Sequence, residues 1–186
     1  MQININDIKN GMTIEMDGNL CTIVEFQHVK PGKGPAFVRI KLKNLRTGST
    51  VENTYNTNLK ITKAHVEKMN VQFLYAQGDT YVFMNMETYE QIEVPVSKLE
   101  DKVQFIKEGL ELQIDSYNGE IIGITLPDKI AFEVIETEPA VKGNTTNNAQ
   151  KDAKIETGYV VKVPLFINQG EKILISTSDG KYYSRA

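Results

Sequence analysis

Short apolar runs separated by glycine, proline and polar residues make up most of the chain. In the first third, residues 20–26 and 36–45 have the length and the β-branched and aromatic side chains that are typical of strands. The second run alternates Phe37, Leu42 and Leu45 imperfectly with basic residues, so one face can pack while the other carries charge. This part of the chain therefore predicts a small barrel.

The middle third repeats the strand pattern and also contains the best helical stretch. Residues 71–75 and 81–85 predict one hairpin, and residues 111–117 and 120–124 predict a second one around the strong turn signal Asn-Gly. Between the two hairpins, residues 95–109 carry valine, leucine and isoleucine at helix-like spacing. This spacing predicts a short helix that packs across the end of a barrel.

The last third adds four more apolar runs and one polar stretch. Residues 130–136, 159–163, 165–167 and 172–176 predict strands. The polar residues 143–152 predict a loop that contributes nothing to a core. Together with the first two thirds, these runs predict an all-β protein.

Three consecutive small β-barrels account for the whole pattern, and we place them at residues 1–63, 64–127 and 128–186. Segments of about 60 residues are near the lower limit for independent folding. We therefore expect close packing between neighbouring barrels.

Composition excludes several classes of function. With 40% hydrophobic and 24% charged residues the chain should fold, and no apolar run approaches the roughly 18 residues that span a bilayer. The N-terminal residues lack a basic start followed by an apolar stretch, so we expect a cytoplasmic protein without a membrane partner. The single Cys21 reads as a small buried hydrophobe, and His28 and His65 are too few for a multi-histidine site. We expect no metal, no cofactor and no catalytic residue.

Charge is distributed unevenly, although the whole chain carries only -3. Residues 1–63 have a net charge of +4, residues 64–127 have -7, and residues 128–186 have 0. The segment from 27 to 51 contains six cations and no acidic residue. Such a segment attracts phosphate backbones, while the acidic middle repels nucleic acid in the wrong orientation. Solvated cations on a strand pair are the alternative explanation.

The turn between the first two strands carries the strongest candidate chemistry. Lys33 has Gly32 and Gly34 on either side, which allow a tight turn, while Pro31 and Pro35 restrict the entry and the exit of the loop. A cation held forward in this way suits a site lined by phosphates and 2′-hydroxyls. The alternative is an exposed turn whose lysine only faces water. The spacing of a phosphate-binding loop is absent, which excludes nucleotide hydrolysis of that kind.

The chain closely resembles bacterial elongation factor P along nearly its full length. The matching pieces, in order, are residues 30–45, 72–75, 81–85, 89–91, 143–145, 157–159, 163–167, 170–171 and 182–185. The resemblance implies an L-shaped, tRNA-like protein with one SH3-like, KOW-type barrel followed by two OB-fold barrels. The relative that carries hypusine lacks the third barrel, so residues 128–186 point to the bacterial branch. The chain departs from the family pattern at Asn56, Asp152 and Tyr183.

The resemblance also implies a function without enzyme activity. A monomer would bind the 70S ribosome between the peptidyl and exit tRNA sites and present Lys33 to the peptidyl-transferase centre. It would position the CCA end of the peptidyl-tRNA and so stimulate peptide-bond formation, above all at polyproline stretches. Candidate contacts with ribosomal RNA and tRNA are Lys30, Arg39, Lys41, Lys43, Tyr182 and Arg185.

Two further questions stay open at the level of sequence. Lys33 is a possible target of a lysine-modifying enzyme, whereas family branches with proline on both sides of the loop are associated with an unmodified lysine. The alternatives to the assignment are an elongation factor P-like paralogue and a generic OB-fold RNA-binding protein. The second of these requires aromatic residues along a basic groove, and the charge of -7 in the middle argues against it.

Overall fold

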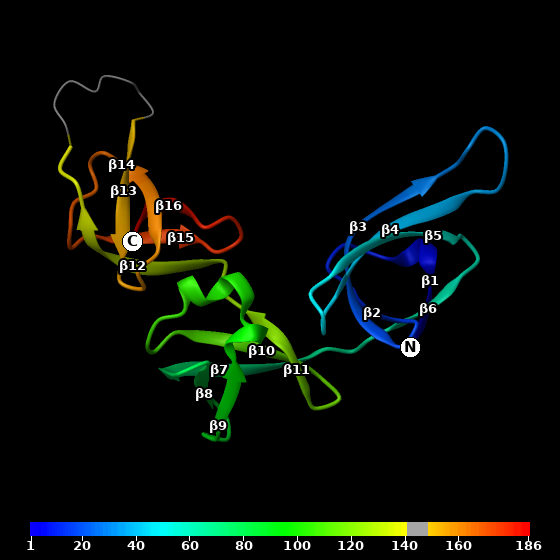
Figure 1. Ribbon diagram of the computed structural model, residues 1–186, viewed down its shortest axis with the longest axis horizontal. Helices are drawn as coiled ribbons and strands as arrows, with labels where there is room; N and C mark the ends of the chain where they lie inside the picture. Colours follow the sequence, from blue (N-terminus) through cyan, green and yellow to red (C-terminus); the bar gives the residue numbers. More distant parts are fainter. Residues whose placement is uncertain (141–148) are drawn as a thin grey trace. The chain divides into compact units, whose positions relative to one another are not determined.

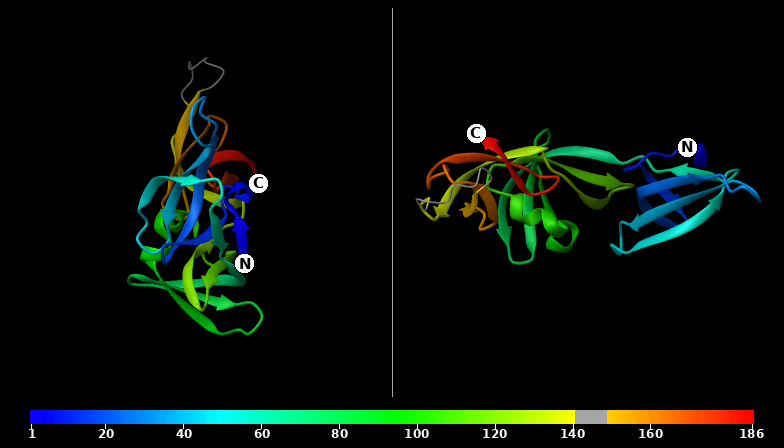
Figure 2. Two further views of the ribbon diagram at one scale, coloured as in Figure 1. Left: turned by 90° about the vertical axis from the view of Figure 1, so that its right-hand side faces the viewer. Right: turned by 90° about the horizontal axis from the view of Figure 1, so that it is seen from above.

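The computed structural model describes residues 1–140 and 149–186, which form three successive sheets joined by short connections. Each sheet curls toward a barrel, as Figures 1 and 2 show. The predicted all-β class with three consecutive barrels is confirmed. By its contacts the chain divides into two compact units, Met1–Lys68 with Asp115–Gly123 and Met69–Ile114 with Ile124–Ala186. The barrel boundaries placed at 63/64 and 127/128 stay a prediction.

The first sheet has the strand order β1-β6-β2-β3-β4-β5. Its elements are β1 (Gln2–Asn4), η1 (Ile5–Asp7), β2 (Thr13–Met16), β3 (Asn19–Val29), β4 (Phe37–Asn44), β5 (Thr50–Asn56) and β6 (Lys60–Lys63). Aliphatic side chains from all parts of this segment form one core, namely Ile5, Ile8, Ile14, Ile23, Val38, Ile40, Leu42 and Ile61, with Cys21 among them. The loop that joins β3 to β4 projects from one end of the sheet (Figure 1).

Strand β4 separates its apolar and charged side chains more cleanly than the sequence predicted. Val38, Ile40 and Leu42 are buried, while the intervening Arg39 and Lys41 are exposed. The predicted alternation began at Phe37, which lies out of phase with the inward positions. The period of two therefore starts one residue later, and it is regular from there on.

The second sheet has the order β11-β10-β7-β8-β9. Its elements are β7 (Glu67–Gln77), β8 (Thr80–Asn85), β9 (Gln91–Pro95), η2 (Val96–Lys98), η3 (Glu100–Phe105), β10 (Glu111–Tyr117) and β11 (Glu120–Thr125). Both predicted hairpins are confirmed, and β10 has the predicted bounds.

The predicted helix over residues 95–109 is wrong in type. The segment forms two short 3-10 helices, in which Leu99 N donates to Val96 O at 3.0 Å and Lys102 N to Leu99 O at 3.0 Å. Glu100 has φ +52, which an α-helix cannot accommodate. Leu99 is nevertheless fully buried. The apolar spacing thus marked a buried face without deciding the kind of helix.

The third sheet has the order β14-β13-β12-β15-β16. Its elements are β12 (Lys129–Thr137), β13 (Gln150–Ile155), β14 (Val160–Pro164), β15 (Lys172–Ser176) and β16 (Lys181–Arg185). The predicted strand at residues 165–167 is wrong, because a turn follows β14 there, with Ile167 N donating to Pro164 O at 3.2 Å. Ile167 is fully buried, so its apolar character serves packing and not a strand.

The loop predicted over residues 143–152 is wrong at its end, since β13 begins at Gln150; residues 143–148 lie outside the described part. The strand was not recognised because its composition is polar, yet exposed and buried residues alternate regularly along it. Lys151, Ala153 and Ile155 are the buried ones. Lys151 is only 8% exposed, and its Nζ donates to Glu138 O at 2.6 Å. A long aliphatic stem with a satisfied terminal amine can take a core position that looks polar in sequence.

The 3-10 segment of the second sheet packs against the third sheet within the second compact unit. The Phe105 and Tyr159 rings meet edge to face at 5.5 Å, and Thr157 Oγ1 donates to Gln104 O at 2.6 Å. Lys107 Nζ donates to the carbonyl oxygen of Ala131. The close packing expected between neighbouring barrels is present here.

Gly180 provides a test of this packing. It is buried with φ +70, and a Cβ at this position would lie 2.7 Å from the Tyr159 hydroxyl, which donates to Gly180 O at 2.9 Å. Gly180→Ala should lower the free energy of unfolding by about 1 to 3 kcal/mol more than Gly170→Ala. Gly170 is the matched control, because it has φ +89 but open space around a Cβ.

Denaturant unfolding followed by circular dichroism gives the comparison. Combining Gly180→Ala with Tyr159→Phe should cost less than the sum of the two single changes, because the hydroxyl that clashes is gone. Additive costs would show that the contact does not limit this position.

Candidate functional site

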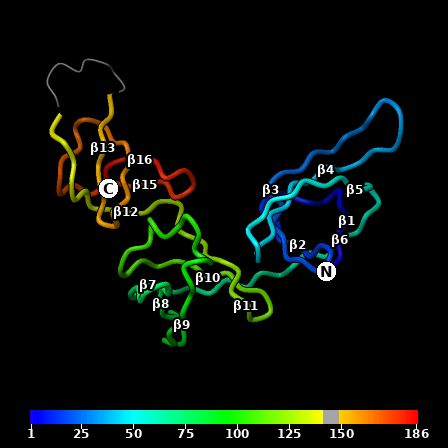
Figure 3. The backbone as a smooth tube through the Cα atoms, viewed as in Figure 1, coloured from blue at the N-terminus to red at the C-terminus, as the bar shows by residue number. Residues whose placement is uncertain are grey.

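The loop between β3 and β4 is the most exposed candidate site. The two strands stay paired up to Val29 and Phe37, so the loop of residues 30–36 is supported by a complete ladder at its base. Lys30 and residues 31–35 are all exposed. Figure 3 shows this loop at the end of the extended β3–β4 hairpin. The predicted projection of the loop therefore has a structural basis.

The two glycines of the loop play different parts. Gly34 has φ +101, a conformation that side-chain-bearing residues rarely adopt, whereas Gly32 has no such requirement. A Cβ at either position would meet no atom within 4 Å. Gly34 thus sets the backbone turn, while Gly32 only keeps bulk away from the neighbouring Lys33. The sequence motif could not distinguish these two roles.

Lys33 is exposed, and no ion pair joins it to the described residues. Its amine is therefore available to a partner outside the chain. The prolines at 31 and 35 fix the φ angle of their own residues and so lower the number of loop conformations. Less conformational entropy is then lost when the loop enters a crowded cavity.

The basic strand face is less basic than the sequence indicated. Arg39 and Lys41 are exposed on β4, and Lys43 is partly buried. Lys41 has Glu25 on one side and Glu52 on the other in the register of the sheet, and Arg39 Nε lies 3.5 Å from Glu52 Oε1. Both carboxylates come from just outside the acid-free segment. In the folded sheet these carboxylates therefore partly neutralise the positive charge of residues 27–51, which a count along the sequence had shown without any acidic neighbour.

Tyr182 and Arg185 lie on β16 of the third sheet and do not belong to the tip. Tyr182 is partly buried and paired with Ile175, so much of its ring serves packing. Arg185 is exposed, with its guanidinium 4.5 Å from the centre of the Phe166 ring and its Nε 3.5 Å from Glu171 Oε2. Of the two residues, Arg185 offers more surface to a partner.

The three positions at which the resemblance indicated a departure are all exposed. Asn56 ends β5 and accepts from Asn58 N at 2.9 Å, and Asp152 pairs with Lys162 at 2.7 Å. Tyr183 is 58% exposed at the register shift of β16, with Lys129 Nζ 3.8 Å from its ring centre. Such a bulge turns a side chain outward. None of the three departures disturbs a core.

Other chemistry finds little support. Cys21 is 6% exposed, and burial, with a smaller contribution from the charge of Asp17, raises the pKa of its thiol, which keeps the reactive thiolate scarce. Among residues 1–140 and 149–186, no three histidine, cysteine or acidic side chains gather where they could hold a metal ion. In the same residues, no helix is long and apolar enough to cross a membrane.

Comparisons with known families match the chain in three consecutive pieces. Residues 4–61 match the elongation factor P KOW-like domain, and residues 66–124 match the elongation factor P OB domain. Residues 130–185 match the elongation factor P C-terminal domain. The three matches occur in the order of the family and leave only short gaps between them.

Two solved structures are similar to part of the chain. Eukaryotic translation initiation factor 5A from Methanococcus jannaschii is 27% identical with a TM-score of 0.57, and the match covers 68% of this chain and 92% of that one. A translation initiation factor eif-5a family protein from Naegleria fowleri is 18% identical with a TM-score of 0.49, covering 68% and 98%.

The unequal roles of the two loop glycines lead to a prediction. Gly34→Ala should strain the loop by about 1 to 2 kcal/mol, whereas Gly32→Ala should be close to neutral. Because residues 30–35 are exposed, Gly34→Ala should relieve the strain by changing the loop conformation. Amide chemical shifts of residues 30–36 should therefore change in Gly34→Ala far more than in Gly32→Ala, with nearly equal melting temperatures. Similar shifts in both variants would contradict the assigned roles.

Proposed function

Because the chain belongs to the elongation factor P family of translation factors, we propose that it binds between the peptidyl and exit tRNA sites and presents Lys33 to the peptidyl-transferase centre. Members of this family work on the ribosome and are not enzymes, so the chemistry is performed by the ribosome. The factor acts in the cytoplasm as a monomer and uses no cofactor.

The observation that carries the proposal is the exposed Lys33 on a loop whose base is the continuous β3–β4 pairing from Glu25 to Val29. A cation held forward on a stiff loop can contact RNA without a large loss of conformational entropy. By holding the CCA end of the peptidyl-tRNA and the nascent chain, the factor lowers the barrier through orientation. Polyproline stretches need this most, since proline is conformationally restricted.

Cations outside the tip hold the factor in place through phosphate contacts, which position without reading sequence. Arg39, Lys41 and Lys43 on β4 serve this purpose in the first domain, together with Lys30 at the start of the loop. Arg185 and Tyr182, which both lie on β16, contact RNA from the third domain.

Lys33 works without modification in this proposal. Gly34 and the two prolines restrict the loop, so a short side chain can take the place of an extended one. Should a lysine-modifying enzyme act here, the native protein would show added mass on the peptide that contains Lys33. Unmodified recombinant protein is therefore the right starting material for the tests below.

Lys33→Ala should remove most of the stimulation of consecutive-proline synthesis, by about tenfold or more. The melting temperature should not change, because an exposed loop residue contributes little packing energy. Lys60→Ala is the control, since Lys60 is also an exposed lysine of the first sheet. A Lys33→Ala protein that melts normally and stimulates fully would disprove the role of Lys33.

Lys41→Glu should weaken ribosome binding and lower its salt dependence, because each lost phosphate contact reduces the slope of log affinity against log salt by about 1. Glu52→Gln should act in the opposite direction, since Glu52 lies beside Arg39 and Lys41. Lys60→Glu makes the same charge change on β6, which is separated from β4 by two strands. Equal effects of Lys41→Glu and Lys60→Glu would indicate a general charge effect and no contact at Lys41.

A further inference from the structure

The tip of the β10–β11 hairpin belongs by its contacts to the unit that carries Lys33. Asp115–Gly123 group with Met1–Lys68, although β10 and β11 themselves are strands of the second sheet. Apart from this hairpin, the chain connects the first sheet to the second through residues 64–66 alone. The hairpin tip therefore supplies a second, non-covalent connection to the first sheet.

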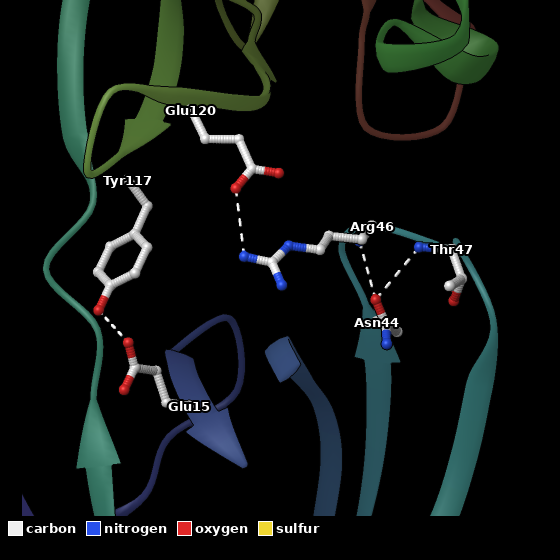
Figure 4. Close-up of polar contacts among 6 residues, drawn as sticks. All are labelled: Glu15, Asn44, Arg46, Thr47, Tyr117 and Glu120. Carbon is white, nitrogen blue, oxygen red and sulfur yellow. Dashed lines mark hydrogen bonds and ion pairs between the residues drawn. The ribbon is translucent and has the colours of Figure 1, made fainter. Parts of the chain in front are cut away.

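Two polar contacts hold the hairpin tip, one on each side of its turn (Figure 4). The Tyr117 hydroxyl donates to the carboxylate of Glu15 on β2. Arg46 Nη2 donates to Glu120 Oε2 at 3.2 Å from the turn that follows β4. We call these two pairs the hairpin latch.

Local structure places both members of the second pair. Asn44 Oδ1 accepts from Arg46 N at 2.8 Å and from Thr47 N at 3.2 Å, which fixes the backbone from which Arg46 extends. On the other side, Asn118 has φ 49 and Gly119 has φ 80, the tight hairpin turn that brings Glu120 opposite Tyr117. Each partner thus comes from a defined turn and not from a free chain end.

We propose that the hairpin latch positions the first sheet, and with it Lys33, during work on the ribosome, and this role rests on the function proposed above. Glu15, Arg46, Tyr117 and Glu120 are then positioning residues that need not touch RNA. Their chemistry fits a contact that can open and re-form. The contact is polar, and the Arg46 and Glu120 side chains remain 49% and 42% exposed. An exposed ion pair shifts an equilibrium by only a few fold.

Reversing the charges of the Arg46–Glu120 pair distinguishes a role in positioning from a role in folding. Arg46→Glu and Glu120→Arg should each lower proline stimulation two- to fivefold at saturating factor, with little change in the concentration that gives half-maximal effect. The double variant should restore most of the activity, because the pair re-forms with its charges exchanged. All three proteins should melt within a few degrees of the unchanged chain.

The matched control is the exposed ion pair of Lys162 with Asp152 in the third sheet, at 2.7 Å. The same exchange of charges there should leave stimulation unchanged in the singles and in the double. Loss of activity from this control would mean that any reversed charge impairs the factor, and it would overturn the latch.

The pKa of Tyr117 provides a test of its hydrogen bond with Glu15 that does not require the ribosome. The hydrogen bond to Glu15, then burial and the charge of Glu15, raise the pKa of Tyr117 above 10.0. Glu15→Gln should lower this pKa, as followed by ring-carbon NMR and assigned by the signal lost in Tyr117→Phe. A raised pKa in the folded state adds stability below pH 10, and that stability is lost as the pH rises through the raised value. Tyr117→Phe should not show this loss.

The outcomes distinguish the latch from the function on which it rests. The proposed function and the latch are both supported if Lys33→Ala is inactive, the single latch variants are weakened and the double variant is restored. Inactive Lys33→Ala together with fully active latch variants, or with no rescue in the double, overturns the latch alone. A fully active Lys33→Ala overturns the proposed function and the role of the latch with it. An unchanged titration of Tyr117 in Glu15→Gln overturns the first contact.

Discussion

The β3–β4 ladder is the interaction on which the rest of this structure depends. One face of β4 places Val38, Ile40 and Leu42 in the core of the first sheet, and the other face exposes Arg39 and Lys41. The same paired strands carry the loop with Lys33 at their end. A single ladder therefore joins the stability of the sheet to the position of the loop, because a shift by one residue would exchange the two faces.

The other sheets connect to their neighbours by different means. In the second compact unit, an aromatic contact between the buried Phe105 and the partly buried Tyr159 joins the 3-10 segment to the third sheet. In the first unit, polar pairs such as Arg46 with Glu120 hold the hairpin tip. Apolar burial makes a lasting contact, whereas exposed ion pairs contribute at most about 1 kcal/mol each. The second unit thus contains a junction held by apolar burial, whereas the hairpin tip in the first unit is held by weaker polar contacts.

Local patterns predicted the strands well and other conformations poorly. Alternating runs such as 130–136 are strands because a period of two admits few alternatives. The spacing in 95–109 could not distinguish an α-helix from 3-10 turns, since both bury residues three or four apart. Lys151 was missed because composition records a charge and not the aliphatic stem that fills a core position.

The sequence by itself determined the three barrels, the projecting Gly-Lys-Gly loop and the family, because these depend on local spacing and on the order of motifs. Only the tertiary structure decided which charges meet. Glu52 reaches Arg39 and Glu120 reaches Arg46 through strand register and packing, which bring together residues far apart in the chain. The electrostatic field at the site and the contacts that position it arise from those pairings, and a count along the sequence contains neither.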